Sequence, residues 1–545
     1  MACDVEPMRG LVAAVTMIAA CGPGARPEDD APGGGGSGGD GGAAPATCTA
    51  VGTSNAGCEL WAVDLANAID VFGPPENGIC DGFGPAAKPL GALPVCVLPD
   101  GTFAGRCDLG SSCAAAPAGA TCEVRDACGL DAQHSPYAII VANTAEQPAD
   151  ITLTDAAGTT MTVTVAAGAI ATLAPQALGF ADHSVGPAGI AANAYRITAT
   201  QPVVAYQMNP LDNVGVFSDD ASLLLPDHVL GTSYLAMSYP TMVRRPASDD
   251  WHADLTIVAP GDATVTVTAT TDLVDGTGLT LHSGETRSYP LHAFEALHLI
   301  AAGGDLTGTS VVADRPIAAF AGHEATVIQD PFPFRNPCCA DHLEDQLYPT
   351  TTWGQKFAIP RGLERVTQIH DYVRIMAQRP NTVVQVVPDL GALSTCGGKL
   401  LAAGQFCELF PQQDVELTSN EPVLVGHFMV SGGGLSPQSG DPSLAFVPPV
   451  EQFRASYTLV VPEQYATNDL QVITPAGGTV VLDNADISLL LATFGSGTWS
   501  AARVAITPGA HTVACPDKCS VEIAGWDAAV SYLYSGGLEL APIVQ

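Results

Sequence analysis

The phrase at 200–208 reads TQPVVAYQM, and related phrases follow as DRPIAAFAG at 314–322 and NEPVLVGHF at 420–428. In each phrase, a polar segment ending in proline leads into an apolar run. A proline has no N–H to give to a sheet, so it is tolerated where a strand starts. The apolar run after it is typical of a strand buried on both faces. The phrases therefore predict related β modules, with a weaker fourth copy expected at 526–534.

The sequence around these phrases is also typical of β-strands. Thr and Val alternate in MTVTV at 161–165, TVTVT at 264–268 and TVVQVV at 382–387. Such alternation is typical of half-buried pleated strands, and Gly, Asp and Pro separate the runs at short intervals. A long helical period is missing, and 341–347 is one of the few short candidates for a helix. The sequence thus predicts an all-β fold.

The spacing of the phrases, near 100 residues, suits a self-sufficient β-sandwich of six to eight strands. A β-propeller is the alternative, since the same strands could form blades of four around a ring. We favour tandem β-sandwich-like repeats preceded by a small disulfide-rich segment. The predicted modules span 136–222, 223–330, 331–445 and 446–545.

The N-terminal region has the pattern of an export signal. Residues 11–20 read LVAAVTMIAA, with Arg9 before them and Cys21 after them. Ten apolar residues are too few to span a bilayer but fit the core of a signal peptide. The last four residues, IAAC, resemble a bacterial lipobox, in which the cysteine becomes the lipidated first residue. We expect a lipoprotein signal peptide at 1–21, lipidation of Cys21, and anchoring to the outer membrane or cell surface, outside the cytoplasm.

The segment 22–47 is rich in Gly, Ala, Pro and Asp and is predicted to be a flexible linker. The next segment, 48–135, holds eight cysteines and few apolar runs, so crosslinks are expected to hold it more than a core does. Of the 16 cysteines, Cys3 and Cys21 fall in the targeting segment. In an exported chain the other 14 are expected to form disulfides. They are Cys48, Cys58, Cys80, Cys96, Cys107, Cys113, Cys122, Cys128, Cys338, Cys339, Cys396, Cys407, Cys515 and Cys519.

The charge of the chain limits its partners. There are 56 acidic and 20 basic residues, for a net charge of −36. Nucleic acids and anionic lipids are both bound through clustered Lys and Arg, so neither is an expected partner. We expect contact with a membrane only through the lipid anchor. The acidity itself is typical of a soluble surface.

No convincing catalytic signature emerges, and the chain is predicted not to be an enzyme. The one G-x-S-x-G match, at 35–39, lies in the linker, without the strand and helix of a nucleophile elbow. A metal-assisted extracellular hydrolase remains an alternative. It would use His323, in the incomplete zincin-like sequence GHEAT, or the group at 341–345. The same group at 341–345 is also typical of a short capped helix.

Two binding features remain open. Hard oxygen ligands on a loop suit a structural Ca²⁺, although such residues also make Asx-turns. The candidate ligands are Asp212, Asn213, Asp219 and Asp220, and no other cofactor is expected. Tryptophans could stack on sugars, although one per module is more typical of a core. They are Trp61, Trp251, Trp353, Trp499 and Trp526.

Several blocks resemble the N-terminal domain of IgGFc-binding proteins. They are 194–226, with NPLDNVGVFSDDASLLLP at its end; 341–347 with 353–354; and 440–444 with 450–454. The likeness is clearest over 190–465 and extends to 136–545, while 57–64 resembles the segment that precedes this domain in bacterial members. The resemblance implies an extracellular interaction module. We therefore predict a binding or adhesion module for an extracellular protein or glycan; the alternatives are the hydrolase and a purely structural envelope component.

Overall fold

The computed structural model describes residues 48–49, 52–74, 88–107, 112–113, 116–211, 217–243, 250–329, 339–362, 365, 371–432 and 440–543. They belong to one compact unit, Ala46–Gln545. The predicted signal peptide with Cys21 and the predicted linker lie outside the described residues. So do Cys80, Asp212, Asn213 and Cys338.

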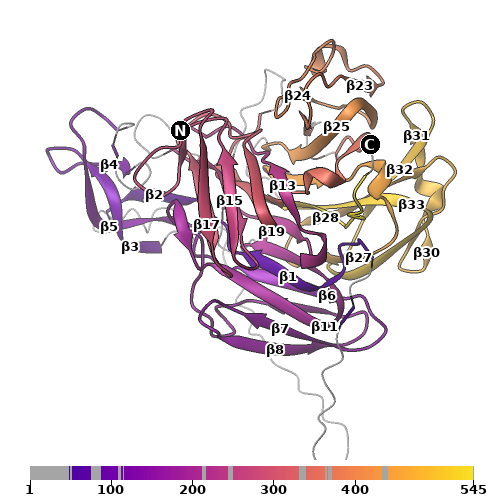
Figure 1. Ribbon diagram of the computed structural model, residues 1–545, viewed down its shortest axis with the longest axis horizontal. Helices are drawn as coiled ribbons and strands as arrows, with labels where there is room; N and C mark the ends of the chain where they lie inside the picture. The colour runs from indigo at the N-terminus through magenta and orange to yellow at the C-terminus, as the bar shows by residue number, and fades with distance from the viewer. Residues whose placement is uncertain are drawn as a thin grey trace, which may run out of the picture. The chain divides into compact units, whose positions relative to one another are not determined.

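The all-β prediction is confirmed (Figure 1). The strands of module 1 are β1 (Gly57–Val63), β6 (Ala138–Asn143), β7 (Ala149–Thr154), β8 (Thr160–Val165), β9 (Ile170–Leu173), β11 (Ala194–Asn209) and β12 (Asp220–Leu224). Grouped by strand pairing rather than by the predicted boundary at 330, those of module 2 are β13 (Gly231–Leu235), β14 (Ala253–Val258), β15 (Ala263–Thr268), β16 (Leu273–Val274), β17 (Thr286–Leu291), β18 (Ala296–Ala301), β19 (Ser310–Thr326) and β20 (Asp341–Gln346), which pairs with β19; β10 (Gly189–Ala191) also pairs with β18.

The later modules repeat this order. Module 3 has β21 (Gly354–Ile359), β22 (Tyr372–Ala377), β23 (Val384–Val387), β24 (Phe406–Leu409), β25 (Val415–Met429) and β26 (Ser443–Val447). Module 4 has β27 (Arg454–Val461), β28 (Thr467–Pro475), β29 (Val481–Leu482), β30 (Ala485–Asp486), β31 (Ala492–Phe494), β32 (Trp499–Ala505), β33 (Gly509–Asp527) and β34 (Val530–Ser535).

Short 3-10 turns connect some of these strands: η2 (Asp227–Val229), η3 (Thr350–Thr352), η4 (Gly391–Leu393), η5 (Val450–Gln452) and η6 (Ser488–Leu490). Within the described ranges, no helix has the length and apolar character needed to cross a membrane.

Each module is built on one long strand, β11, β19, β25 or β33, whose first and second halves pair with different strands. In β19, residues 310–313 pair with β13 and β15, whereas residues from 318 onward pair with β14 and β20. Between the halves, the pairing is interrupted by an irregular segment that ends in Pro316. The prolines of the repeated phrase therefore stand where a long strand changes from one set of pairing partners to the next, at an irregularity that needs no N–H there. The two halves of the long strand, each with its own neighbouring strands, make the sandwich-like repeat.

The fourth long strand lies earlier in the sequence than predicted. The irregular segment of β33 is 515–518. The residue after it, Cys519, pairs with the first residue of β27. In modules 2 and 3, the residue after the proline likewise pairs with the first residue of β13 or β21. The disulfide Cys515–Cys519 spans this segment, with Lys518 at positive φ in place of proline. The expected copy at 526–534 instead covers the turn and the inner strand β34.

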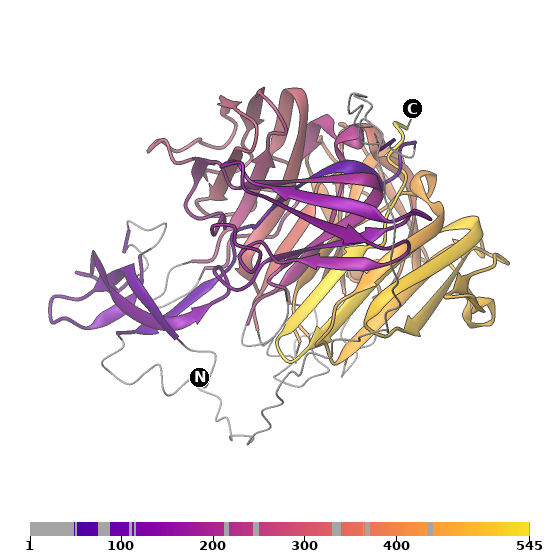
Figure 2. The ribbon, with the colours of Figure 1, turned by 90° about the horizontal axis from the view of Figure 1, so that it is seen from below.

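The last strands of the modules, β12, β20, β26 and β34, meet in a ring. Each contacts the two that neighbour it, in the order β12, β20, β26, β34 and back to β12. Each of them is also the strand of its sheet nearest the ring, and the sheet continues outward through the long strand. In module 1, for example, the spatial order from the ring outward is β12, β11, β6 and β9. The sheets that contain the inner strands are thus arranged around the ring like the blades of a propeller. The fold therefore combines features of the β-sandwich repeat and the β-propeller that the sequence left as alternatives. Figure 2 shows the sheets of the modules from below.

The modules share a core. The largest cluster of buried apolar side chains draws on all four, for example Tyr206, Leu299, Phe446 and Tyr534. A second cluster, with Leu60, combines side chains of module 1 with some of module 2, such as Phe320. Because the largest core contains side chains from every module, the repeats form one unit rather than independently folded domains.

A latch closes the ring between modules 4 and 1. Asn55 N–H donates to the carbonyl of Leu538 at 3.2 Å, and Leu540 N–H donates to that of Thr53 at 2.7 Å. The following strand, β1, pairs with β11, so part of the segment predicted to be Cys-rich belongs to module 1. The first and last segments of the described chain therefore lie side by side.

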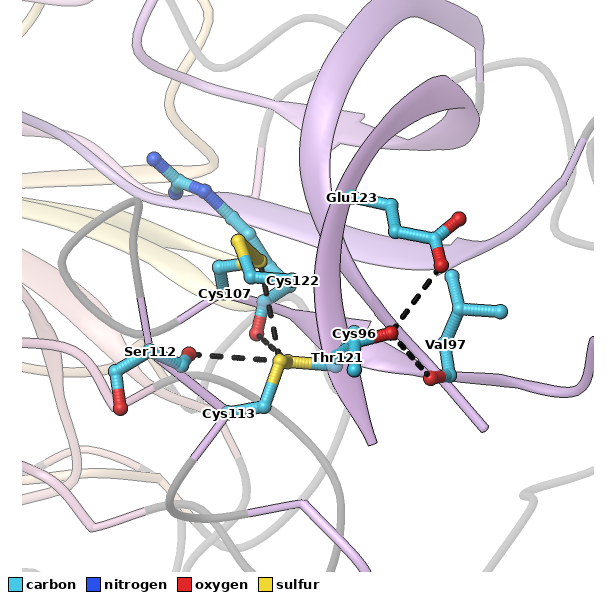
Figure 3. Close-up of a disulfide and its surroundings, with 9 residues drawn as sticks. Cys96, Val97, Cys107, Ser112, Cys113, Thr121, Cys122 and Glu123 are labelled. Carbon is cyan, nitrogen blue, oxygen red and sulfur yellow. Dashed lines mark hydrogen bonds between the residues drawn. A yellow bond between two sulfur atoms is a disulfide. The ribbon is translucent and has the colours of Figure 1, made fainter. Parts of the chain in front are cut away.

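The disulfide-rich sheet lies between β1 and β6 in the sequence. It consists of β2 (Ile69–Gly73), β5 (Thr121–Asp131), β3 (Lys88–Val97) and β4 (Phe103–Arg106), in that spatial order. Its disulfides Cys96–Cys113 and Cys107–Cys122 are close neighbours, with Cys107 and Cys113 sulfurs 4.0 Å apart (Figure 3). Cys48–Cys58 and Cys396–Cys407 are also disulfides, and Cys128 and Cys339 are disulfide-bonded. The predicted use of disulfides is confirmed for these cysteines.

One carboxylate joins the four inner strands. Asp220, at the start of β12, is buried at the centre of the ring. Its Oδ1 accepts the N–H of Ala221 at 2.9 Å and of Leu533 at 3.3 Å. Its Oδ2 accepts the N–H of Leu444 at 3.0 Å and of Glu344 at 3.1 Å. These donors come from β12, β34, β26 and β20, so one side chain satisfies a backbone group from every inner strand.

Glycines make close contacts between neighbouring modules. We call β1, β13, β21 and β27 the lead strands. The first three begin with Gly57, Gly231 and Gly354. These glycines pack against Pro226, Pro349 and Pro449, respectively, and each proline precedes the 3-10 turn of the next module. A Cβ on Gly231 would lie 2.6 Å from Cβ of Pro349. A proline ring cannot rotate away, so these positions require glycine because of the close approach.

We expect Gly231→Ala to lower stability by about 1–3 kcal/mol through overpacking at the boundary of modules 2 and 3. The control is Gly261→Ala, because a Cβ on Gly261 meets no heavy atom within 4 Å. Calorimetric unfolding of both variants checks this. A thermal midpoint of Gly231→Ala equal to that of the control would contradict the packing argument.

Removal of the central carboxylate should cost more. Asp220→Ala leaves three inter-strand N–H groups without their buried acceptor, and each such loss costs ~1–3 kcal/mol. We expect a decrease of at least about 3 kcal/mol in the free energy of unfolding, measured by chemical denaturation. Asp126→Ala, at an exposed position on β5, serves as the control. Equal stability of the two variants would show that the ring does not depend on Asp220.

Candidate functional site

The inner strands place polar side chains at the centre of the ring. Strand β20 reads DHLEDQ, and all six residues are buried. The expectation of a short helix at 341–347 is therefore wrong. Alternation of apolar and polar residues is absent from this strand because both of its faces lie inside the molecule, where its polar groups are paired with other inner strands.

Glu344 collects side-chain donors at the ring. Ser222 Oγ donates to its Oε1 at 2.7 Å, and Gln207 Nε2 lies 3.4 Å from both carboxylate oxygens. His342 Nε2 lies 3.4 Å from Oε2. Gln207 also accepts, through Oε1, the hydroxyl of Tyr137 at 3.0 Å. These groups come from β12, β11, β20 and the residue before β6, so the network links modules 1 and 2.

Asp345 and Gln346 connect further strands. Asp345 Oδ2 accepts the N–H of Phe446 at 2.7 Å, and Gln346 Oε1 accepts that of Leu225 at 2.7 Å. Burial raises the pKa of Asp345 well above its ordinary value, while the N–H groups of Phe446 and Gln346 oppose the rise. Side chains of β20 thus accept backbone N–H groups from β26 and from the residue that follows β12.

A carboxyl cluster lies beside the starts of the inner strands. Asp341 Oδ1 accepts the N–H of Asp219, and Ser531 N–H lies 3.2 Å from both Asp341 Oδ2 and Asp219 Oδ1. Tyr465 donates its hydroxyl to Asp219. Burial raises the pKa of both Asp341 and Asp441, and the neighbouring acids raise that of Asp341 further. Burial beside other acids therefore favours the protonated form of Asp341.

The calcium prediction stays a prediction. Asp219 and Asp220 are buried and accept backbone N–H groups, whereas Asp212 and Asn213 lie outside the described residues. Through the described ranges, one set of three Cys, His, Asp or Glu residues brings a ligand atom from each within 4.8 Å of the others. That set is Cys96, Cys107 and Cys113, whose sulfurs are held in disulfides.

The histidines considered for hydrolysis lie inside the fold. His323, on β19, is fully buried, and its Nε2 lies 3.1 Å from the carbonyl of Pro240. Burial lowers the pKa of His323 to about 3, so the ring is neutral at physiological pH. His342 Nδ1 lies 2.9 Å from the carbonyl of His323, which links β20 to β19. These contacts hold strands together rather than facing a solvent-filled cleft.

The tryptophans considered for sugar stacking are part of the core. Trp61, Trp251, Trp353 and Trp526 are buried, and Trp499 is half-buried, packed edge-on against Phe453 with ring centroids 5.7 Å apart. Their faces are therefore taken by protein neighbours.

Sequence reasoning missed a buried ion network between modules 3 and 4. His427, on β25, has Nδ1 2.8 Å from Glu522 and Nε2 3.1 Å from Asp371. Burial alone lowers its pKa, but the two carboxylates outweigh burial and raise it to about 10. Asp371 also accepts from Arg365 at 2.9 Å. The phrase NEPVLVGHF contains His427, but nothing in the phrase shows that acids from other strands meet it.

Cavities open at the surface of the described chain, and a pair of them bears on binding. One, of about 550 Å³, lies on the disulfide-rich sheet and is lined by Phe103, Val124 and Arg125 among others. The other, of about 370 Å³, lies at the latch between modules 4 and 1. We call it the junction pocket. It is lined by Ser54, Asn55, Ala56, Thr144, Val204, Arg454, Ser456, Tyr457, Thr458, Thr512, Val513, Ala514 and Gly536.

The junction pocket has donors at its inner end. Arg454, the first residue of β27, donates from Nη1 to Asn55 Oδ1, and its Nε lies 3.9 Å from Glu539. Its guanidinium carbon lies 5.8 Å from the ring centroid of Tyr457. Asn55 is fully buried, and its Nδ2 has no acceptor among the described residues. The pocket therefore combines a cation, an amide donor and surrounding hydroxyl groups.

Comparison with known proteins gives one informative match. A search of curated proteins finds no match. Among solved structures, the chain aligns with the "tetra-tandem repeat in extending region of large adhesion protein" at 12% identity, covering 75% of this chain and 97% of that one. The TM-score is 0.08, too low to bear on the fold. A family model described as IgGFc binding protein matches residues 220–525, from the first inner strand into the last long strand and over more than half of the sequence, so the chain belongs to this family.

Proposed function

We propose that this protein is a cell-surface lipoprotein whose β modules bind an extracellular protein or glycan. The observation that carries the proposal is the family match over 220–525. That span contains three of the four inner strands and most of modules 2 to 4. The family is named for binding an antibody region, and the repeated architecture presents several outer faces from one rigid ring.

The polar chemistry of the interior supports a binding role. The buried acids of β12 and β20 are paired with backbone N–H groups and side-chain donors from other strands. Groups committed to such contacts stabilise the fold, because leaving a buried donor unpaired costs ~1–3 kcal/mol. Recognition then falls to the outer surface, where the junction pocket opens.

Attachment to the cell envelope is supported by the sequence. The apolar segment 11–20 followed by Cys21 has the pattern of a lipoprotein signal, and disulfides are typical of exported chains. A lipid on Cys21 would anchor the protein outside the cytoplasm, with 22–47 between the membrane and the β modules. The net charge of −36 does not favour direct contact with anionic lipid.

The binding role can be tested with the full chain, purified in detergent and immobilised for biolayer interferometry. The probes are the Fc fragment of immunoglobulin G, a mucin glycoprotein and a panel of defined glycans. We expect saturable binding to at least one probe, with the mass of the probe unchanged after incubation. Folded protein, checked by circular dichroism, that binds none of these probes would contradict the proposal, as would turnover of a bound probe.

The anchor can be tested by substitution. Cys21→Ser removes the thiol that would carry the lipid, so we expect the protein to move from the membrane fraction to the soluble fraction and to lose labelling by a radioactive fatty acid. Cys3→Ser is the matched control, because Cys3 precedes the proposed cleavage site and should leave both readouts unchanged. Retention of Cys21→Ser in the membrane fraction would rule out this anchor.

A further inference from the structure

The junction pocket lies where the repeat symmetry of the molecule is broken. By strand pairing, the lead-strand residues Gly57, Gly231 and Gly354 correspond to Arg454. Each glycine packs on a proline of the next module and closes that boundary. At the fourth boundary, the large cation replaces glycine, and a cavity of about 370 Å³ is present.

The arginine is held in place but retains donors for a ligand. Its Nη1 donates to Asn55 Oδ1, which fixes the guanidinium against the latch. Glu539 lies 3.9 Å from Nε, a distance longer than a charge-assisted hydrogen bond. An arginine has five N–H donors in a planar fork that matches a carboxylate. In a chain with 56 acidic and only 20 basic residues, this fixed cation at a pocket selects for an anion.

The rest of the lining indicates what carries the anion. Asn55 adds a buried Nδ2 donor without an acceptor among the described residues. The hydroxyl groups of Ser54, Thr144, Ser456, Thr458 and Thr512 line the same cavity. Hydroxyl and amide groups of this kind pair with the hydroxyl groups of a sugar, and the volume is in the ~300–1,000 Å³ range of small-molecule sites.

We propose that the junction pocket binds an acidic sugar residue, with the sugar carboxylate on Arg454 and Asn55 and the sugar hydroxyls on the Ser and Thr side chains. The inference rests on the proposed binding function and specifies its ligand. It also assigns a role to the latch, because Ser54 and Asn55 come from the first described segment and Arg454 and Ser456 from module 4.

The test measures binding of glucuronic acid and N-acetylneuraminic acid to the full chain by isothermal titration calorimetry. Glucose and N-acetylglucosamine are the neutral comparisons, and a short peptide with a free carboxyl terminus tests a carboxylate without a sugar. We expect at least one acidic sugar to bind ~10-fold or more tightly than its neutral comparison, because charge-assisted hydrogen bonds are about twice as strong as neutral ones. Its affinity should also fall with added salt.

Variants locate the site. Arg454→Gln should weaken binding of the acidic sugar ~10-fold or more, whereas Arg379→Gln, at an exposed arginine of module 3, should leave it unchanged. Because Arg454→Gln could also loosen the latch, a second pair is needed. Ala514 is exposed at the rim, so Ala514→Glu should weaken binding and Ala514→Lys should strengthen it without changing the thermal midpoint.

Three results would overturn the inference: unchanged affinity for the acidic sugar in both Arg454→Gln and Ala514→Glu, equal affinity for neutral sugars, or binding of the peptide carboxylate alone. If the full chain binds an extracellular probe in interferometry while these sugar experiments fail, the proposed function stands and only the pocket assignment is lost. If it binds no probe in either experiment, the binding function itself fails.

Discussion

The fold depends on a carboxylate that accepts backbone N–H groups from four strands at once. Asp220 gives each inner strand an acceptor at the place where the strands converge. Inner strands of neighbouring modules contact each other through side chains and are hydrogen-bonded along their length only to their own long strands. Backbone groups facing the centre therefore need acceptors from side chains. A single buried acid meets that need with a geometry that fixes all four strands relative to one another.

The same constraint explains why the interior of this protein is rich in acids. Burial raises the pKa of Asp220, and nearby Glu344 adds to the rise, while the N–H groups of Ala221, Leu444 and Glu344 favour the charged form. Glu344, Asp345 and Asp341 likewise accept donors from neighbouring strands. An acid in such a position contributes to the ring as a buried hydrogen-bond acceptor. The composition suggested only a soluble surface, because it does not distinguish buried acids of this kind from acids exposed to solvent.

Much of the fold could be predicted from local patterns. The Thr and Val runs predicted strands, and the phrases that contain Pro202, Pro316 and Pro422 located three of the long strands. Prediction failed where the fourth copy has its proline, Pro516, within the disulfide Cys515–Cys519 rather than directly before the second half of the strand, and where β20 is mostly polar because both of its faces are buried. The junction pocket could not be predicted either, because Arg454 and Asn55 are distant in sequence and meet only when the ring closes.

The disulfide Cys48–Cys58 has a mechanical consequence. Tension applied from the N-terminal side enters the compact unit at Cys48 and passes through the sulfur bridge to Cys58, which lies within β1. The intervening loop, which contains Thr53 and Asn55, is bypassed and carries no load. The pull then runs lengthwise along β1 and is shared by its hydrogen bonds to β11, which resist in shear. Under such tension, the contacts that close the ring stay relaxed.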